Sequence, residues 1–150
     1  METFATGDRT IRDLTDQFGI GHDNRQRFVD SCRQFRDRYE QLTELLTTPD
    51  RPTIMVSHIP PFNTKIDRHH STHGTSDEDL HIGSLSLKIA MRHHPPIVAI
   101  SGHSHTQAYD SFGTESERLV HLVGVGFRGV GLIDVDGRSG SFGIDFLTGS

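Results

Sequence analysis

Two short apolar segments, each followed by residues that end a strand, constrain the fold of this chain most strongly. They are TIMVS at residues 53–57 and IVAIS at residues 97–101. Short apolar runs bounded by proline and glycine signals are typical of buried strands. The pattern therefore predicts two buried strands. Functional residues are expected in the polar loops at their carboxyl ends, where sites gather in sheets of this kind.

The segments around these strands predict two helices. Apolar residues at steps of three and four predict an amphipathic helix over 24–47, with Asp23 or Asn24 as its N-cap. A second helix is expected over 84–92, with Ser84 as its N-cap and two prolines shortly after its end.

The remaining segments are interpreted as loops and as a β-meander. Residues 1–22 are expected to be mostly irregular, and residues 62–82 to form a long polar loop. Three further strands are predicted at 119–126, 129–136 and 141–147, the last two joined by the turn DGRSG. This order favours a single α/β (α+β) domain with stacked layers around a mixed sheet.

Composition excludes several classes of protein. The chain is 150 residues long, enough for one domain with a real core, and a single cysteine, Cys32, excludes an internal disulfide. No apolar run approaches the roughly 18 residues of a membrane helix, and no signal-peptide core is recognisable. We therefore expect a cytoplasmic protein without a membrane partner. The net charge of −5 argues against broad nucleic-acid binding.

Histidines follow both predicted strands. His58 comes after the first strand, and His103 and His105 come after the second, preceded by Gly102. Neighbouring strands could bring these three imidazoles to one point, and imidazole binds Zn, Mn, Fe and Ni. Gly102 is expected to allow the tight turn that aims the imidazoles, and the prolines at 60–61 to fix His58. The sequence therefore predicts a metal site.

The other histidines have less specific surroundings. His81 stands near the start of a helix, where backbone N–H groups can face an anion, so it is the candidate substrate-binding residue. The loop histidines could form a second metal cluster with nearby aspartates, but a polar loop at the mouth of the site is favoured. Its members are His69, His70, His73, Asp67 and Asp77.

Three more histidines are assigned structural roles. His93 and His94 lie at the expected C-terminus of a helix, where partial positive charge is favourable. His121 alternates within a predicted strand, so we expect it to be a packed or edge residue.

Two motifs resemble the last two signature blocks of the calcineurin-like metallophosphoesterases. They are SHIPPF at 57–62 and GHSH at 102–105. NTKID at 63–67 and HIGS at 81–84 resemble the segment between these blocks in small prokaryotic members. The likeness covers roughly residues 50–137. It implies a four-layer α/β/β/α sandwich with metals at the loop edge of its sheets.

The resemblance also implies an activity and a ligand set. Members of this family hydrolyse phosphomonoesters or phosphodiesters at a centre of two divalent metal ions. By resemblance, His58 and His103 would bind one metal and His105 the other. The metals would be Mn, Fe, Zn or Ni, and the substrate a phosphate ester.

The chain departs from the family pattern in its first half. The blocks D-x-H, G-D-x-x-D and G-N-H-D/E are absent; GDRTI at 7–11 and GHDN at 21–24 match them only in part. The absent blocks would supply the carboxylate that bridges two mutually repelling metals. We therefore expect one partial domain, the C-terminal half. The other half would lie upstream, be lost, or come from a second chain.

A half sandwich predicts an unusual surface. One sheet face and some strand edges would be bare, which favours pairing between chains. We therefore expect a homo-oligomer or reduced stability, and a cooperatively melting monomer would contradict this expectation.

The residues leave three functions open. One is a metal-dependent phosphoesterase, and another is a non-catalytic remnant that acts as a metal-binding or interaction module. The third is a mononuclear hydrolase with one zinc held by His58, His103 and His105. Metal stoichiometry distinguishes the third, since it requires one ion per chain.

Overall fold

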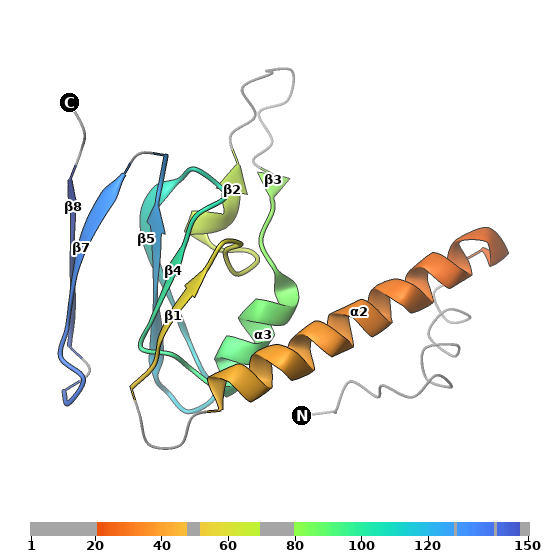
Figure 1. Ribbon diagram of the computed structural model, residues 1–150, viewed down its shortest axis with the longest axis horizontal. Helices are drawn as coiled ribbons and strands as arrows, with labels where there is room; N and C mark the ends of the chain where they lie inside the picture. Colours follow the sequence, from red (N-terminus) through yellow and green to blue (C-terminus); the bar gives the residue numbers. More distant parts are fainter. Residues whose placement is uncertain (1–20, 48–51, 70–79, 128, 140, 148–150) are drawn as a thin grey trace. The chain divides into compact units, whose positions relative to one another are not determined.

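The computed structural model describes residues 21–47, 52–69, 80–127, 129–139 and 141–147, and they form a mixed α+β structure (Figure 1). The chain divides into two compact units, Met1–Gln41 and Leu42–Ser150. The predictions for residues 1–20 and for the loop histidines at 70 and 73 lie outside the described residues.

Both predicted helices are confirmed. Helix α2 spans His22–Leu46, so the expected N-cap is wrong: Asp23 and Asn24 lie inside the helix. The helix starts before the first residue of its apolar pattern. The backbone N–H of Asn24 already donates to the carbonyl of Gly21 at 2.9 Å. Helix α3 spans Leu85–His93. Its N-cap is Ser84, as predicted, whose hydroxyl accepts from a backbone N–H of the first turn.

A four-stranded mixed sheet forms the centre of the second unit. Its strands are β1 (Ile54–Ser57), β4 (Val98–Ser101), β5 (Gln107–Gly113) and β6 (Leu119–Val125). The order across the sheet is β1-β4-β6-β5, with β4 parallel to both β1 and β6, and β5 antiparallel to β6.

The two strands predicted to be buried differ in the structure. Strand β4 lies between β1 and β6, and Val98 and Ala99 are fully buried, as expected. Strand β1 is at the edge of the sheet, and Ile54 and Val56 are 57% and 75% exposed. The prediction of burial is therefore wrong for β1. The apolar composition of a strand does not predict whether the strand lies at the edge or in the middle of a sheet.

The predicted three-stranded meander is also wrong. Strands β7 (Val130–Val135) and β8 (Phe142–Leu147) form the expected antiparallel hairpin, but it is a separate two-stranded sheet. Strand β6 pairs with β4 and β5 instead of β7. The sequence pattern predicts no strand at residues 107–113. These residues form β5, which pairs with β6 in the place expected for β7.

The predicted loop 62–82 contains short ordered elements. A 3₁₀ turn, η1, spans Lys65–Asp67, and strands β2 (Arg68–His69) and β3 (Leu80–His81) pair antiparallel. The prediction that residues 62–82 form a loop without regular structure is therefore wrong near both ends of this segment. There β2 and β3 pair through their backbones.

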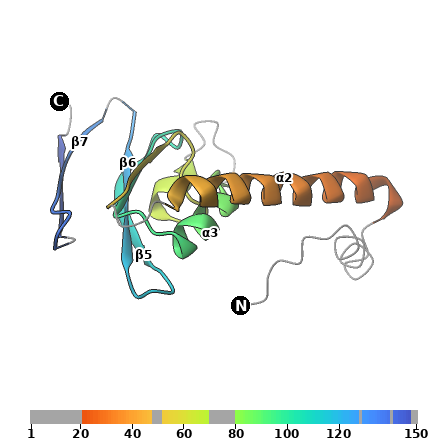
Figure 2. The ribbon, with the colours of Figure 1, turned by 60° about the horizontal axis from the view of Figure 1, so that its bottom comes forward.

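The core of the second unit lies on the face of the sheet covered by η1 and α3. Ile66 of η1 and Met91 of α3 are fully buried. Ile66 packs against β6 at Gly124, where an added Cβ would come within 3.2 Å of the isoleucine side chain. Figure 2 shows α3 on one side of β5 and β6, and β7 on the other.

His121 joins the opposite face of the sheet to the hairpin. Its ring stacks on Phe142 of β8, with centroids 4.2 Å apart and planes 10° from parallel. Its Nδ1 lies 2.8 Å from the hydroxyl of Tyr109 on β5. The expectation that His121 is a packed residue is confirmed. Burial of the ring lowers the pKa of His121 below its usual value of 6.5.

The lowered pKa of His121 predicts a loss of stability in acid. Below pH 6.5 the unfolded chain binds a proton that the folded ring resists, so the free energy of unfolding falls as pH drops from 6.5 toward the folded pKa. Denaturant unfolding of His121→Gln at pH 7.5 and about pH 5.5 should show a smaller difference than the parent chain.

His94→Gln is the matched control, because His94 lies outside the stack, just beyond α3, and its Nδ1 lies 3.3 Å from the uncharged hydroxyl of Thr47. It should keep the pH dependence of the parent. An equal dependence in His121→Gln and in the parent would contradict the assignment.

Candidate metal centre

The two histidine motifs lie at the same edge of the sheet. His58 follows β1 and His103 follows β4, and these strands are parallel neighbours whose last residues, Ser57 and Ser101, are partners in register. The two serine hydroxyls lie 3.1 Å apart. Since the carboxyl ends of parallel strands coincide, the segments that leave them begin side by side.

The structure brings His58 and His103 into direct contact. Nε2 of His58 lies 2.9 Å from Nδ1 of His103, and the ring centroids are 4.7 Å apart in an edge-to-face arrangement. Both residues are exposed. In the neutral state one ring nitrogen donates and the other accepts, so each imidazole directs a nitrogen at the other.

His105 takes a different position from the one expected. Its ring lies 5.3 Å, centroid to centroid, from the ring of Phe127. Among the described residues, no three or more His, Cys, Asp or Glu side chains are grouped closely enough to hold a metal ion. The structure therefore brings together two of the three predicted ligands.

The geometry of the pair fits two ligands of one metal ion. Zinc–nitrogen bonds of about 2.0–2.1 Å in a tetrahedral site place two nitrogens about 3.3 Å apart. The nitrogens of His58 and His103 are 2.9 Å apart, so a small separation of the rings would admit an ion in place of their shared hydrogen bond. The other ligands would have to come from elsewhere.

The turn after β4 is made by the histidines and not by the glycine. His103 and His105 have φ angles of 61° and 58°, in the left-handed region. Gly102 does not have a positive φ. The expectation for Gly102 is therefore wrong. Left-handed backbone costs a non-glycine residue about 1–2 kcal/mol, so surrounding contacts must hold both histidines in place.

Ser104 supplies such contacts. It is buried between the two histidines, and its hydroxyl donates to the carbonyl of Ile66 at 2.5 Å. Its backbone N–H donates to the carbonyl of Gly102 at 2.7 Å. The GHSH turn is thereby fixed to the η1 segment on the neighbouring loop.

His81 is held by a buried carboxylate. Asp67 is fully buried, and its Oδ1 lies 2.7 Å from Nδ1 of His81. The same carboxylate accepts the backbone N–H groups of Asn63 at 2.8 Å and Thr64 at 3.1 Å. The sequence interpretation assigned Asp67 to a polar loop and missed this role. The capping-box spacing Thr64-x-x-Asp67 could have identified the hydrogen bond from Thr64 to Asp67, but not the contact of Asp67 with His81.

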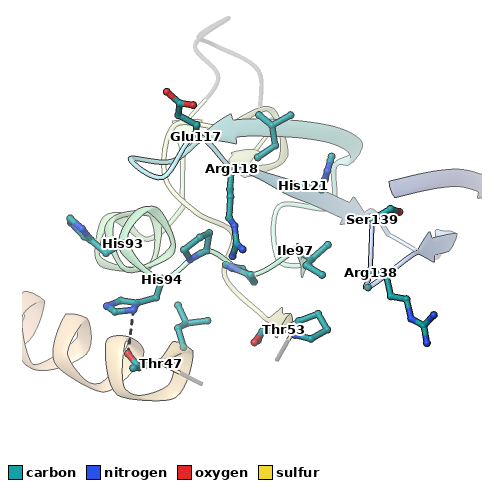
Figure 3. Close-up of a pocket in the computed structure, with 16 residues that line it drawn as sticks. Thr47, Thr53, His93, His94, Ile97, Glu117, Arg118, His121, Arg138 and Ser139 are labelled. Carbon is teal, nitrogen blue, oxygen red and sulfur yellow. Dashed lines mark hydrogen bonds between the residues drawn. The ribbon is translucent and has the colours of Figure 1, made fainter. Parts of the chain in front are cut away.

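His93 and His94 lie at the opposite edge of the sheet. They line a surface depression with Thr53, which precedes β1, and Ile97, which precedes β4 (Figure 3). Nδ1 of His94 lies 3.3 Å from the hydroxyl of Thr47. This depression is at the amino ends of the strands, so it is separate from the candidate metal centre, and the structural role expected for both histidines is retained.

Comparison of the chain with protein-family models, curated protein sequences and solved structures found no match. In the part of the chain that the structure describes, no helix has both the length and the apolar character needed to cross a bilayer. The fold and the site therefore define the chain only as a mixed α+β protein with a paired-histidine site at a sheet edge.

Proposed function

We propose that this chain is the metal-binding half of a calcineurin-like phosphoesterase that hydrolyses phosphomonoesters or phosphodiesters. The observation that carries the proposal is the His58–His103 pair, whose facing nitrogens lie 2.9 Å apart at the ends of adjacent parallel strands. The strand ends are where such folds place their ligands. The two motifs that resemble the family supply these two residues.

In this proposal each histidine has a defined role. His58 and His103 bind one divalent ion, and His105, which follows the same turn, binds the second. Bound divalent ions, Mn, Fe, Zn or Ni, would supply Lewis acidity toward the phosphate and activate water. His81, held rigidly by Asp67, contacts the substrate.

The remaining half of the site is proposed to come from outside the described residues. The four-layer sandwich is completed by a missing N-terminal half or by a second copy of the chain, in a cytoplasmic protein. The exposed edge strand β1, with Ile54 and Val56 largely uncovered, supports such a partner.

A second candidate function is a metal-binding or interaction module without catalysis. It is favoured by one observation: in the described chain, the His58–His103 pair has no third metal-binding side chain grouped with it. A mononuclear zinc hydrolase would also need His105 to join the pair.

The test measures metal content and hydrolysis in the same samples. The chain and a form extended upstream are each loaded with Mn²⁺ or Zn²⁺, desalted, and assayed by elemental analysis and with bis(4-nitrophenyl) phosphate. Two bound ions and metal-dependent hydrolysis are expected where the site is complete, both lost in His58→Ala and His103→Ala and kept in His93→Ala. One ion per chain with hydrolysis indicates the mononuclear enzyme, and metal without hydrolysis in both forms indicates the binding module. Unchanged metal content in His58→Ala and His103→Ala contradicts all three.

A further inference from the structure

The surface depression lined by His93 and His94 has the size of a binding site for a small molecule. Its volume is about 1020 Å³, at the upper end of the volumes of such sites. Its walls come from the end of α2, the segment before β4, the turn before β6 and the turn between β7 and β8. The proposed phosphoesterase reaction makes no use of it.

One wall of the depression, residues 95–97, is apolar and fixed. The backbone N–H of Ile97 donates to the carbonyl of Thr53 at 2.8 Å, and the N–H of His121 donates to the carbonyl of Ile97 at 3.1 Å. Pro95 and Pro96 precede Ile97, and their rings restrict the backbone. A wall that is already ordered binds a ligand without a further loss of conformational entropy.

Two arginines supply positive charge to the depression. Arg118 lies in the turn before β6, and its side chain extends into the depression between His94 and Ile97 (Figure 3). Arg138 lies at the rim, in the turn between β7 and β8. The ion pairs of the described residues include neither guanidinium. The donors of both arginines are therefore available to a bound oxyanion.

The acidic side chains nearby are directed elsewhere. Glu117 also lines the depression, but its carboxylate points away from the side chain of Arg118 (Figure 3). Asp136, close to the rim, accepts the hydroxyl of Ser139 at 2.6 Å and the backbone N–H of Arg138 at 2.8 Å. Neither carboxylate neutralises the guanidinium of Arg118.

The C-terminal ends of α2 and α3 also lie at this edge, where helices carry partial negative charge. Carbonyls of their last turns are already bonded: Thr43 accepts the N–H of Thr47 at 2.9 Å, and Ala90 accepts the N–H of His94 at 2.8 Å. The field of a helix end is confined to its last turn and amounts to about half a charge. The full charge of Arg118 therefore makes its side of the depression the favourable place for an anion.

We propose that the depression binds a small organic oxyanion with an apolar body. The planar guanidinium of Arg118 matches two oxygens of a carboxylate, phosphonate or phosphate group. The apolar body lies against residues 95–97 and the side chain of Leu119, which is 57% exposed. The ligand would sit at the opposite edge of the sheet from the paired histidines. This inference therefore stands without the proposed phosphoesterase function.

The experiment titrates the metal-stripped chain with phenylphosphonate and follows backbone amide signals by ¹H–¹⁵N nuclear magnetic resonance. Phenylphosphonate carries both an oxyanion and a ring, and its carbon–phosphorus bond is not a phosphate ester. Inorganic phosphate supplies the charge alone, and benzyl alcohol the ring alone. We expect phenylphosphonate to shift the amides of Ile97, Arg118 and Leu119 with a Kd of about 1 mM or below, and the other two probes to bind at least about 10-fold more weakly.

Arg118→Gln tests the charged contact. The backbone of Arg118, and not its side chain, is bonded to the hydroxyl of Thr114, so the turn should keep its fold. We expect phenylphosphonate to bind about 10-fold more weakly to this variant. Arg92→Gln is the matched control: Arg92 is exposed in the last turn of α3 and does not line the depression. Its Kd should stay within about 2-fold of the parent, because salt screens a remote charge.

Each outcome decides for or against the site. Equal losses in Arg118→Gln and Arg92→Gln indicate diffuse attraction to positive charge and overturn the proposal. Shifts that do not saturate, or that gather at His58 and His103, overturn it as well. If Arg118→Gln does not fold, the three probes on the parent chain decide, and equal affinity for phenylphosphonate and benzyl alcohol overturns the oxyanion site. Saturable shifts in the depression that depend on Arg118 support it.

Discussion

Replacement of Gly83 by alanine is expected to lower the free energy of unfolding by about 3 kcal/mol, the upper end of the usual cost of overpacking. A Cβ at this position would lie 2.7 Å from the backbone N and Cα of Phe62 and 2.8 Å from Oδ2 of Asp67. Two of these atoms are backbone, and the third belongs to a carboxylate fixed by three hydrogen bonds. Neither neighbour can move away without breaking other contacts. Denaturant unfolding measures the effect.

Gly113→Ala is the matched control for this change. Gly113 ends β5, and a Cβ added there meets no atom within 4 Å. Its free energy of unfolding should stay within about 0.5 kcal/mol of the parent, as for most surface substitutions. A Gly83→Ala protein as stable as Gly113→Ala would show that the 62–67 segment is not packed against residue 83.

Replacement of His103 by glycine is expected to stabilise the fold while removing metal binding. At φ 61° the histidine occupies left-handed backbone, which glycine adopts freely, so the free energy of unfolding should rise by about 1 kcal/mol. The same change removes one of the two facing nitrogens of the candidate centre. Metal affinity should fall by more than about 100-fold, beyond what loss of a supporting residue causes. Unfolding and metal titration are measured on one preparation.

Glu117→Gly separates the two effects. Glu117 has a φ of 58° in a turn between β5 and β6 and is exposed, so it should gain similar stability and bind metal like the parent. If His103→Gly is destabilising, the left-handed turn is not strained. If it keeps full metal affinity, His103 is not a ligand.

Local pattern determined much of the scaffold. The long helix appears where the three-and-four spacing predicts it, and α3 appears where its Ser84 cap and the prolines after it predict it. The hairpin of β7 and β8 forms around its predicted turn. Periodicity and capping act over a few residues, so a single sequence contains the information they need. The placement of His58 and His103 after two neighbouring strands also followed from strand ends that the sequence marks with proline and glycine.

Tertiary structure alone decided how these parts are paired and which residues support the site. Strand β1 is apolar but lies at an edge, because only the sheet order sets how many neighbours a strand has. The turn after β4 also departs from the local pattern, because His103 and His105, and not Gly102, adopt left-handed backbone. Asp67 is buried beneath His81, and a hydrogen bond joins these two side chains, which are 14 positions apart in the sequence. Such contacts depend on chain segments that meet only after folding, so no local pattern encodes them.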